Sequence, residues 1–268
     1  MIMARRPQNT GKASGASDAP ASAAASFEPM EARSVDNLPL DEGWQYEPKW
    51  DGFRCLAFRD GDEVELHAKS GKPLGRYFPE IVRLIKSLPG ERFVLDGELA
   101  IPERESLSFD ALQMRLHPAE SRIRKLSAET PAILILFDML LDATGQNLVG
   151  APLTVRRAAL ETFFELSGAS VPSLRLSPYT RDREEAQSWL DKAGGALDGV
   201  VAKRLDGPYE AGERAMLKIK RLRSADCVVG GFRYGTNSRE VGSLLLGLYN
   251  DQGLLDHVGF TSSFADLD

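Results

Sequence analysis

The segment EPKWDGFRCLAFRD (residues 47–60) places one lysine, Lys49, between a proline and a turn-prone Asp-Gly pair, with an apolar run behind it. A surface lysine needs no such setting. A nucleophilic lysine does, because its amine is almost entirely protonated at neutral pH unless nearby cations or a bound metal ion favour proton loss. Arg54, five residues further on, is one such cation. The segment therefore indicates a lysine with a chemical role at the start of a strand-rich fold.

The composition is that of an ordinary globular protein, with 43% hydrophobic and 27% charged residues in 268 positions. This length allows one core and a smaller second one. The two cysteines, Cys55 and Cys227, and three histidines exclude a disulfide scaffold and a Cys/His zinc cluster, and fit a reducing cytoplasm. No apolar run reaches the ~18 residues of a membrane span. The formal net charge of -6 does not exclude nucleic acid, because a local basic face is what binding requires.

Three parts are expected along the chain. Residues 1–33 begin with an Ala- and Ser-rich run that lacks large apolar side chains and a signal-peptide core, so a disordered tail is expected there. Residues 34–221 are expected to form the main domain, and residues 222–268 a second one. Three strand-like runs follow residue 224, too few for a small closed barrel: Asp226–Tyr234, Ser243–Tyr249 and Leu254–Phe260.

Strand patterns dominate the main domain, with helices between them, which predicts an α+β fold of antiparallel sheets. Arg54–Arg59 and Glu63–Ala68 read as a hairpin joined at Asp60-Gly61. A helix is expected from Pro79 onward. The other expected elements are a strand over 91–102 interrupted at its Asp-Gly, a buried strand within 131–150, helices over 152–166 (with Thr154 as N-cap) and 182–194, and strands over 199–205 and 215–221.

Charged side chains recur at the strand ends of this pattern. Lys218 and Lys220 alternate along a strand and so share one face, although two such lysines alone are more often simply solvated. Asp96 and Glu98 lie inside an apolar strand, and Asp198 directly precedes another. Each acid alone reads as a turn or a strand end. Their recurrence in one chain favours a shared site.

Six short motifs in order resemble the nucleotidyltransferase signature of ATP-dependent DNA ligases, which mRNA capping enzymes and RNA ligases share in weaker form. The first, KWDGFR (49–54), matches K-x-D-G-x-R, the motif whose lysine takes AMP covalently. The others are AKSG (68–71, followed by Phe78-Pro79-Glu80), LDGEL (95–99), LFDML (136–140), DGVVAK (198–203) and MLKIK (216–220). Together with the runs after residue 225, they are most similar to bacterial end-joining ligases of the LigC and LigD type. This resemblance implies a nucleotidyltransferase (adenylation) domain followed by an incomplete OB-fold barrel.

The resemblance assigns the reacting groups. Lys49 would be the lysine that takes AMP, and Lys218 and Lys220 would grip the α-phosphate of ATP. Glu98 and Asp198 would hold a divalent ion, Mg²⁺ or Mn²⁺. Asp198 stands where relatives usually carry Glu, a side chain longer by one methylene.

The resemblance also assigns the binding groups. Glu47 would meet the adenine amino group, and Phe137 would stack on the adenine ring. Arg54 would hold the ribose together with Glu98, and Lys203 would belong to the same nucleotide pocket. Lys69, which replaces the Arg of the usual Ser-Arg-Asn-Gly, would meet the 5′-phosphate of a nick. Met216 stands where many relatives have Trp.

The implied activity is that of an ATP-dependent DNA ligase (EC 6.5.1.1). Lys49 takes AMP from ATP, AMP passes to the 5′-phosphate of nicked double-stranded DNA, and the 3′-hydroxyl displaces it. We expect a cytoplasmic, nucleoid-associated monomer that works with end-joining proteins. Because the printed sequence ends after about three strands of the OB-fold, slow adenylation and weak nick sealing are expected. Two alternatives are an RNA ligase or capping-type guanylyltransferase, and a non-catalytic nucleotide- or DNA-binding remnant.

Overall fold

The computed structural model describes residues 27–104, 106–167, 171–193, 197–221, 225–236 and 238–261. Contacts divide the chain into two units, Met1–Arg221 and Leu222–Asp268. The first is a mixed α+β unit built on two sheets. The second is a three-stranded antiparallel sheet. No helix within these described ranges is long and apolar enough to cross a membrane.

The larger sheet of the first unit has five strands in the order β4-β3-β5-β8-β9. All its pairings are antiparallel except β8 with β9. Its strands are β3 (Phe53–Asp60), β4 (Glu63–Ala68), β5 (Arg92–Ala100), β8 (Ile133–Leu141) and β9 (Leu174–Leu176). The expected hairpin is confirmed, with β3 and β4 paired from Cys55 opposite Ala68 to Asp60 opposite Glu63.

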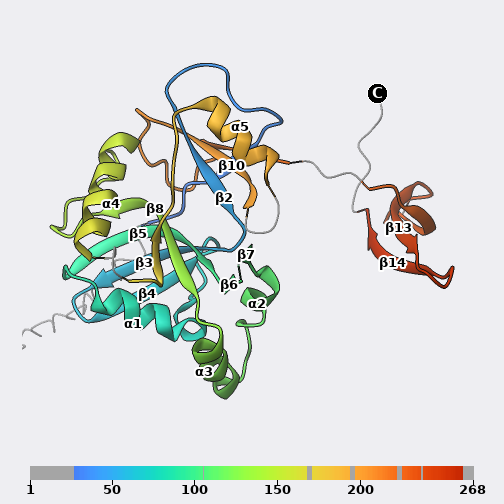
Figure 1. Ribbon diagram of the computed structural model, residues 1–268, viewed down its shortest axis with the longest axis horizontal. Coiled ribbons are helices and arrows are strands. Elements are labelled where there is room, and N and C mark those ends of the chain that lie inside the picture. The colour runs from blue at the N-terminus through green and yellow to red at the C-terminus, as the bar shows by residue number, and fades with distance from the viewer. Residues whose placement is uncertain are drawn as a thin grey trace, which may run out of the picture. The chain divides into compact units, whose positions relative to one another are not determined.

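The smaller sheet has four strands in the order β1-β11-β10-β2, of which only β1 and β11 are parallel. Its strands are β1 (Ala32–Ser34), β2 (Trp44–Trp50), β10 (Leu197–Arg204) and β11 (Met216–Lys220). In Figure 1 β2 and β10 lie on one side of the five-stranded sheet, and α1 lies on the other. A short hairpin of β6 (Pro102–Glu103) and β7 (Ser106–Leu107) completes the strands described in this unit.

Helices pack on both sheets of this unit, and the last of them packs on β2 and β10 of the four-stranded sheet. They are α1 (Pro79–Ser87), α2 (Phe109–Gln113), α3 (Glu120–Glu129), α4 (Leu153–Ser167) and α5 (Arg183–Asp191), with a 3-10 turn η2 (Gly75–Tyr77) before α1. As expected, α1 begins at Pro79 and buries the stripe Ile81, Leu84 and Ile85. This stripe joins the main hydrophobic core with residues from β3, β5 and β8. The core thereby holds the five-stranded sheet rigid beneath the functional pocket.

Three details of the sequence-based prediction are wrong. The tail does not extend to residue 33, because Met30 is buried and β1 pairs with β11; residues 1–26 lie outside the described residues. The strand β5 is continuous through its Asp-Gly, since Gly97 serves a close strand approach instead of a turn. A Cβ on Gly97 would lie 2.7 Å from the Ile135 carbonyl oxygen.

The third error concerns the start of α4. Thr154 is the second residue of the helix, not its N-cap. The amides of Leu153 and Thr154 donate instead to the carbonyls of Gly207 and Leu205, from the segment after β10. A distant stretch of backbone therefore satisfies the helix terminus, and no local pattern could indicate it.

The second unit consists of β12 (Val228–Tyr234), β13 (Val241–Tyr249) and β14 (Leu255–Phe260). Its described residues form no closed barrel, in agreement with the expected incomplete barrel. Many of its apolar side chains are exposed, among them Phe232, Tyr249 and Phe260. An exposed apolar sheet face of this kind ordinarily receives a covering partner.

Candidate active site

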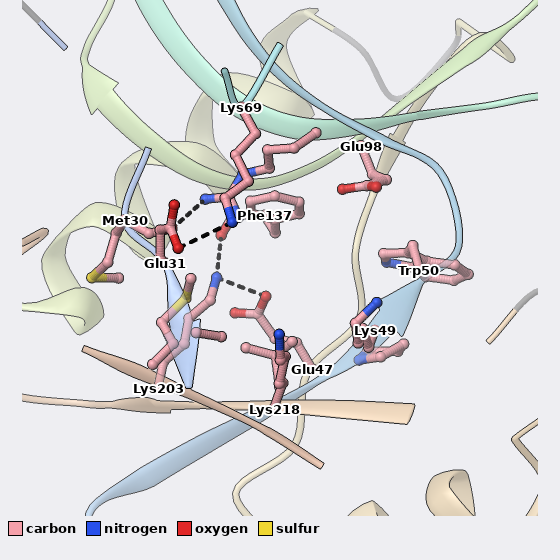
Figure 2. Close-up of a pocket in the computed structure, with 15 residues that line it drawn as sticks. Met30, Glu31, Glu47, Lys49, Trp50, Lys69, Glu98, Phe137, Lys203 and Lys218 are labelled. Atoms are coloured by element: carbon pink, nitrogen blue, oxygen red, sulfur yellow. Dashed lines mark hydrogen bonds and ion pairs between the residues drawn. The ribbon is translucent and has the colours of Figure 1, made fainter. Parts of the chain in front are cut away.

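A cavity of about 250 Å³ opens between the two sheets of the first unit (Figure 2). Residues from β1, β2, β10 and β11 form one side, and residues from β3, β5 and β8 form the other. The lining residues are Met30, Glu31, Ala32, Glu47, Pro48, Lys49, Trp50, Arg54, Lys69, Glu98, Phe137, Val201, Lys203, Met216 and Lys218. In this view Lys49, Trp50 and Glu98 lie on one side of the pocket, and Met30 and Glu31 on the other.

Strand register brings the lysines of distant motifs together. In the four-stranded sheet Lys49 of β2 and Lys220 of β11 both lie opposite Gly199 of β10. Two residues further along β10, Val201 lies opposite both Glu47 and Lys218. Side chains two positions apart on a strand share a face, so one face gathers residues of three motifs.

Asp198 joins two of these lysines. Its carboxylate lies 2.7 Å from the Nζ of Lys49 and 2.7 Å from the Nζ of Lys220. Burial alone would raise the pKa of Asp198, but the hydrogen bonds from Lys220 and Lys49 lower it below its usual value. The carboxylate is therefore ionised at neutral pH and holds both amines at one point.

Gly199 makes this arrangement possible. The pairing of β10 with β2 shifts between Leu197 and Gly199, and Gly199 has φ +148°. A Cβ there would lie 2.0 Å from the Ile219 carbonyl oxygen. The irregularity turns the preceding carboxylate toward the lysines, which is a known use of such bulges.

Glu47 and Lys203 form a buried ion pair with 2.8 Å between Oε2 and Nζ, and their side chains are only 3% and 4% exposed. Gln45 donates a second hydrogen bond to Glu47, at 2.9 Å. The Lys203 ammonium also lies 4.7 Å from the centre of the Phe137 ring. A desolvated pair of this kind fixes the position of both charges, because breaking it leaves one charge buried alone.

Arg54 is held by a buried network. It donates two hydrogen bonds of 2.5 Å to Asp96, which also accepts one of 2.6 Å from the Tyr209 hydroxyl. The Met30 amide in turn donates to that hydroxyl, at 2.9 Å. The Arg54 guanidinium stacks 4.6 Å from the centre of the Phe137 ring. Arg54 is therefore oriented toward the aromatic ring before any ligand binds.

Glu98 carries the most perturbed carboxylate of the pocket. Burial raises its pKa to about 8, against the opposing attraction of Arg54 and Lys49. No group of three or more His, Cys, Asp or Glu side chains in the described part of the chain forms a ready-made metal cluster. Carboxylates such as those of Glu98 and Asp198 are the ligand type of Mg²⁺, which binds proteins through one or two carboxylates and takes its other ligands from substrate phosphates and water.

Lys69 lies at the edge of the pocket, just after β4, with a 57% exposed side chain. Its Nζ lies 3.0 Å from the carboxylate of Glu31, the residue just before β1. A positive charge in this position could meet an anionic group that approaches the pocket from outside.

The structure brings most of the expected site residues together. Glu47, Lys49, Arg54, Lys69, Glu98, Phe137, Lys203 and Lys218 all line the cavity. Asp198 and Lys220 are not lining residues, but they connect to Lys49 through their ion pairs.

Other residues of the site were missed from the sequence. Asp96 was singled out only as one of several strand acids, and Met30, Glu31 and Tyr209 were not singled out for the site. Only the tertiary structure shows that these residues belong to the site, since the contact between Met30 and Tyr209 joins residues 179 positions apart.

The family model of the ATP-dependent DNA ligase domain matches residues 29–220, which contain the whole pocket. The chain belongs to the ATP-dependent DNA ligase family. This confirms the family expected from the six motifs. It also accounts for the α+β fold, the order of the motifs and the gathering of their lysines at one pocket.

Two relatives are 48% identical to this ligase-family chain. They are DNA ligase C2 of Mycolicibacterium smegmatis (over 239 residues) and DNA ligase C of Mycobacterium tuberculosis (over 240 residues). Each alignment covers 88% of this chain and 66% of the relative, so the chain spans just under two thirds of the relatives' length. Among solved structures, the ligase domain of M. tuberculosis LigD matches with 28% identity and a TM-score of 0.56. That match covers 88% of this chain and 72% of the solved one.

Proposed function

We propose that this chain performs the adenylate-transfer chemistry of DNA ligation, with Lys49 as the nucleophile. The observation that carries the proposal is the position of the Lys49 amine. It lies in a pocket that also presents Lys218, Arg54 and Phe137, and it is held there by Asp198. A mycobacterial DNA ligase D, 27% identical with a TM-score of 0.57, has been solved as a complex with ATP.

The first step transfers AMP from ATP to Lys49. The Lys49 amine leaves its ion pair with Asp198, gives up one proton to solvent water and attacks the α-phosphorus of ATP. The N–P bond forms, the bond from that phosphorus to the bridging oxygen breaks, and pyrophosphate leaves. Lys218 and Lys220 supply positive charge for the phosphate oxygens, the main contribution that a protein makes to phosphoryl transfer.

The remaining pocket groups bind and orient the nucleotide. Glu47, fixed by Lys203 and Gln45, is an acceptor for the adenine amino group. Phe137 supplies an apolar surface beside the base, and Arg54 and Glu98 suit the ribose hydroxyls. A divalent ion, Mg²⁺ or Mn²⁺, held by Glu98 and Asp198, would neutralise phosphate charge.

The later steps extend the proposal to nucleic acid. AMP passes to the 5′-phosphate of nicked double-stranded DNA, for which Lys69 supplies a cation, and the 3′-hydroxyl then displaces AMP. This is the reaction EC 6.5.1.1. One relative, 31% identical over 216 residues, is a multifunctional non-homologous end joining protein of Mycobacterium bovis. We place this chain in the same type of bacterial repair, as a nucleoid-associated cytoplasmic monomer with end-joining partner proteins.

The test is covalent labelling. The full chain is incubated with ATP labelled at the α-phosphate, with Mg²⁺ or Mn²⁺, and run on a denaturing gel. Label retained on the protein and mapped to Lys49 supports the proposal, whereas a chain without covalent label would be a binding remnant. A parallel incubation with α-labelled GTP tests the capping-type alternative, since a guanylyltransferase would take label from GTP.

A further inference from the structure

Two cavities of the first unit meet at the ion pair between Glu31 and Lys69. The first is the 250 Å³ pocket already described. The second, of about 480 Å³, is lined among others by Phe27, His67 and Gly71. Glu31 and Lys69 line both cavities, so their 3.0 Å ion pair borders the two spaces.

The two partners of this pair are anchored differently. The Glu31 amide donates to the Glu213 carbonyl at 2.7 Å, and the Glu31 carbonyl accepts from the Met216 amide at 3.1 Å. The backbone therefore fixes the carboxylate at the pocket wall, where it is 28% exposed. Lys69 reaches it with a long side chain that is 57% exposed (Figure 2). Opening the pair requires only that the lysine side chain rotate.

The Glu31 carboxylate is an anion, like the 5′-phosphate that Lys69 is proposed to bind. The hydrogen bond from Lys69 is the largest influence on the pKa of Glu31 and lowers it, against the opposing effect of burial. Glu31 is therefore ionised at neutral pH. An amine binds a carboxylate and a phosphate through the same charge-assisted hydrogen bonds, so the two anions compete for it.

We propose that Glu31 competes with the DNA end for Lys69: it occupies the amine until a 5′-phosphate displaces it, and so weakens the binding of that phosphate. Displacement frees the amine for the phosphate at the edge of the adenylation pocket. A 5′-hydroxyl end carries no charge and gains nothing from the exchange. The inference rests on the proposed role of Lys69.

This competition determines whether Glu31→Gln strengthens or weakens the binding of 5′-phosphorylated DNA. The glutamine has nearly the same shape but no charge, so it releases Lys69 and removes the repulsion toward an incoming phosphate. Because exposed ion pairs are weak, we expect tighter binding of 5′-phosphorylated nicked DNA by about two- to fivefold. Binding of the 5′-hydroxyl duplex should not gain in this way.

The experiment measures fluorescence anisotropy of labelled nicked duplexes with a 5′-phosphate or a 5′-hydroxyl at the nick. The full chain is used without ATP and with EDTA, so the result does not depend on adenylation. The proteins are wild type, Glu31→Gln, Lys69→Met and the double variant. The matched control is Glu28→Gln, which removes the same charge from the second cavity but lies outside the ion pair.

The proposal predicts that Glu31→Gln raises the preference for the 5′-phosphate, that Glu28→Gln does not, and that the gain disappears in the Lys69→Met background. An unchanged or reduced preference in Glu31→Gln, or a gain that survives Lys69→Met, overturns it. Thermal melting checks that each variant is folded. Labelling with ATP on the same preparations judges the proposed function separately, because a failure to label leaves the binding comparison intact.

Discussion

Asp198 and Lys49 lie in contact at 2.7 Å although 149 positions separate them in the chain. The contact exists because β10 pairs with β2 and its register shifts just before Gly199. The same carboxylate holds Lys220 of β11. One acidic side chain thus connects the candidate nucleophile with a lysine of the last motif.

Lys49→Ala should abolish covalent labelling from α-labelled ATP, because Lys49 both lines the pocket and contacts Asp198, whereas Lys220 contacts Asp198 without lining the pocket. Gel labelling followed by peptide mapping checks this. Lys86→Ala, which removes a half-exposed lysine of α1 outside the pocket, is the control and should label normally. Label that persists on the Lys49 variant would show that another residue is the nucleophile.

Asp198→Asn should slow label formation by about 10- to 100-fold and raise the Mg²⁺ concentration needed, the range typical when a residue that orients a metal site is lost. Melting should change little, since the ion pairs of Asp198 are partly exposed and such pairs contribute little to stability. A titration of Mg²⁺ at fixed ATP measures the first effect. An unchanged Mg²⁺ dependence with normal melting would argue against a metal role.

Gly199→Ala should destabilise the first unit by about 3 kcal/mol or more, because the φ of +148° is strained for alanine and its Cβ would collide with the Ile219 carbonyl oxygen. Gly61→Ala is the matched control. Gly61 has φ +60° with open space around it, so only the backbone strain of about 1–2 kcal/mol applies. Urea unfolding of both variants compares the two costs, and equal losses would contradict the close contact at Gly199.

Tyr209→Phe should cost about 2 kcal/mol of stability, since Asp96 loses one charge-assisted hydrogen bond and the Met30 amide loses its acceptor. Because Asp96 orients Arg54, the KM for ATP in label formation should rise as well. Tyr234→Phe, an exposed tyrosine of the second unit, serves as the control. A variant with lower stability but an unchanged KM would limit Tyr209 to a structural role.

Glu98→Gln should stabilise the ligand-free protein at high pH. Burial raises the pKa of Glu98 from its ordinary 4.5 to about 8 in the folded chain, so the folded state binds the proton more tightly than the unfolded state. Wild type therefore loses stability as the pH rises from about 4.5 to about 8, and the glutamine variant does not share this loss. Melting temperatures at pH 5 and pH 9 test this, with exposed Glu103→Gln as control. Equal pH profiles would show that Glu98 is not desolvated.

Local pattern was sufficient for much of the fold. Alternation and the Asp60-Gly61 turn predicted β3 and β4, and Pro79 with its apolar stripe predicted α1. The Asp-Gly within β5 misled the prediction, because the same pair serves a turn or a close strand approach depending on the neighbouring strand. The helix α3 was not predicted, because its mean composition is strongly polar and only Ile123 and Ser127 are buried.

The sequence by itself determined the chemical groups of the site and their family, because the motifs are short runs whose residue types and order are visible without a structure. The tertiary structure alone decided how these groups meet: Asp198 between two lysines, Asp96 with Tyr209 behind Arg54, and Glu31 against Lys69. These contacts depend either on strand register within one sheet or on the approach of the two sheets, and they join residues far apart in the chain. A shift of one residue would turn every such side chain to the opposite face of its strand.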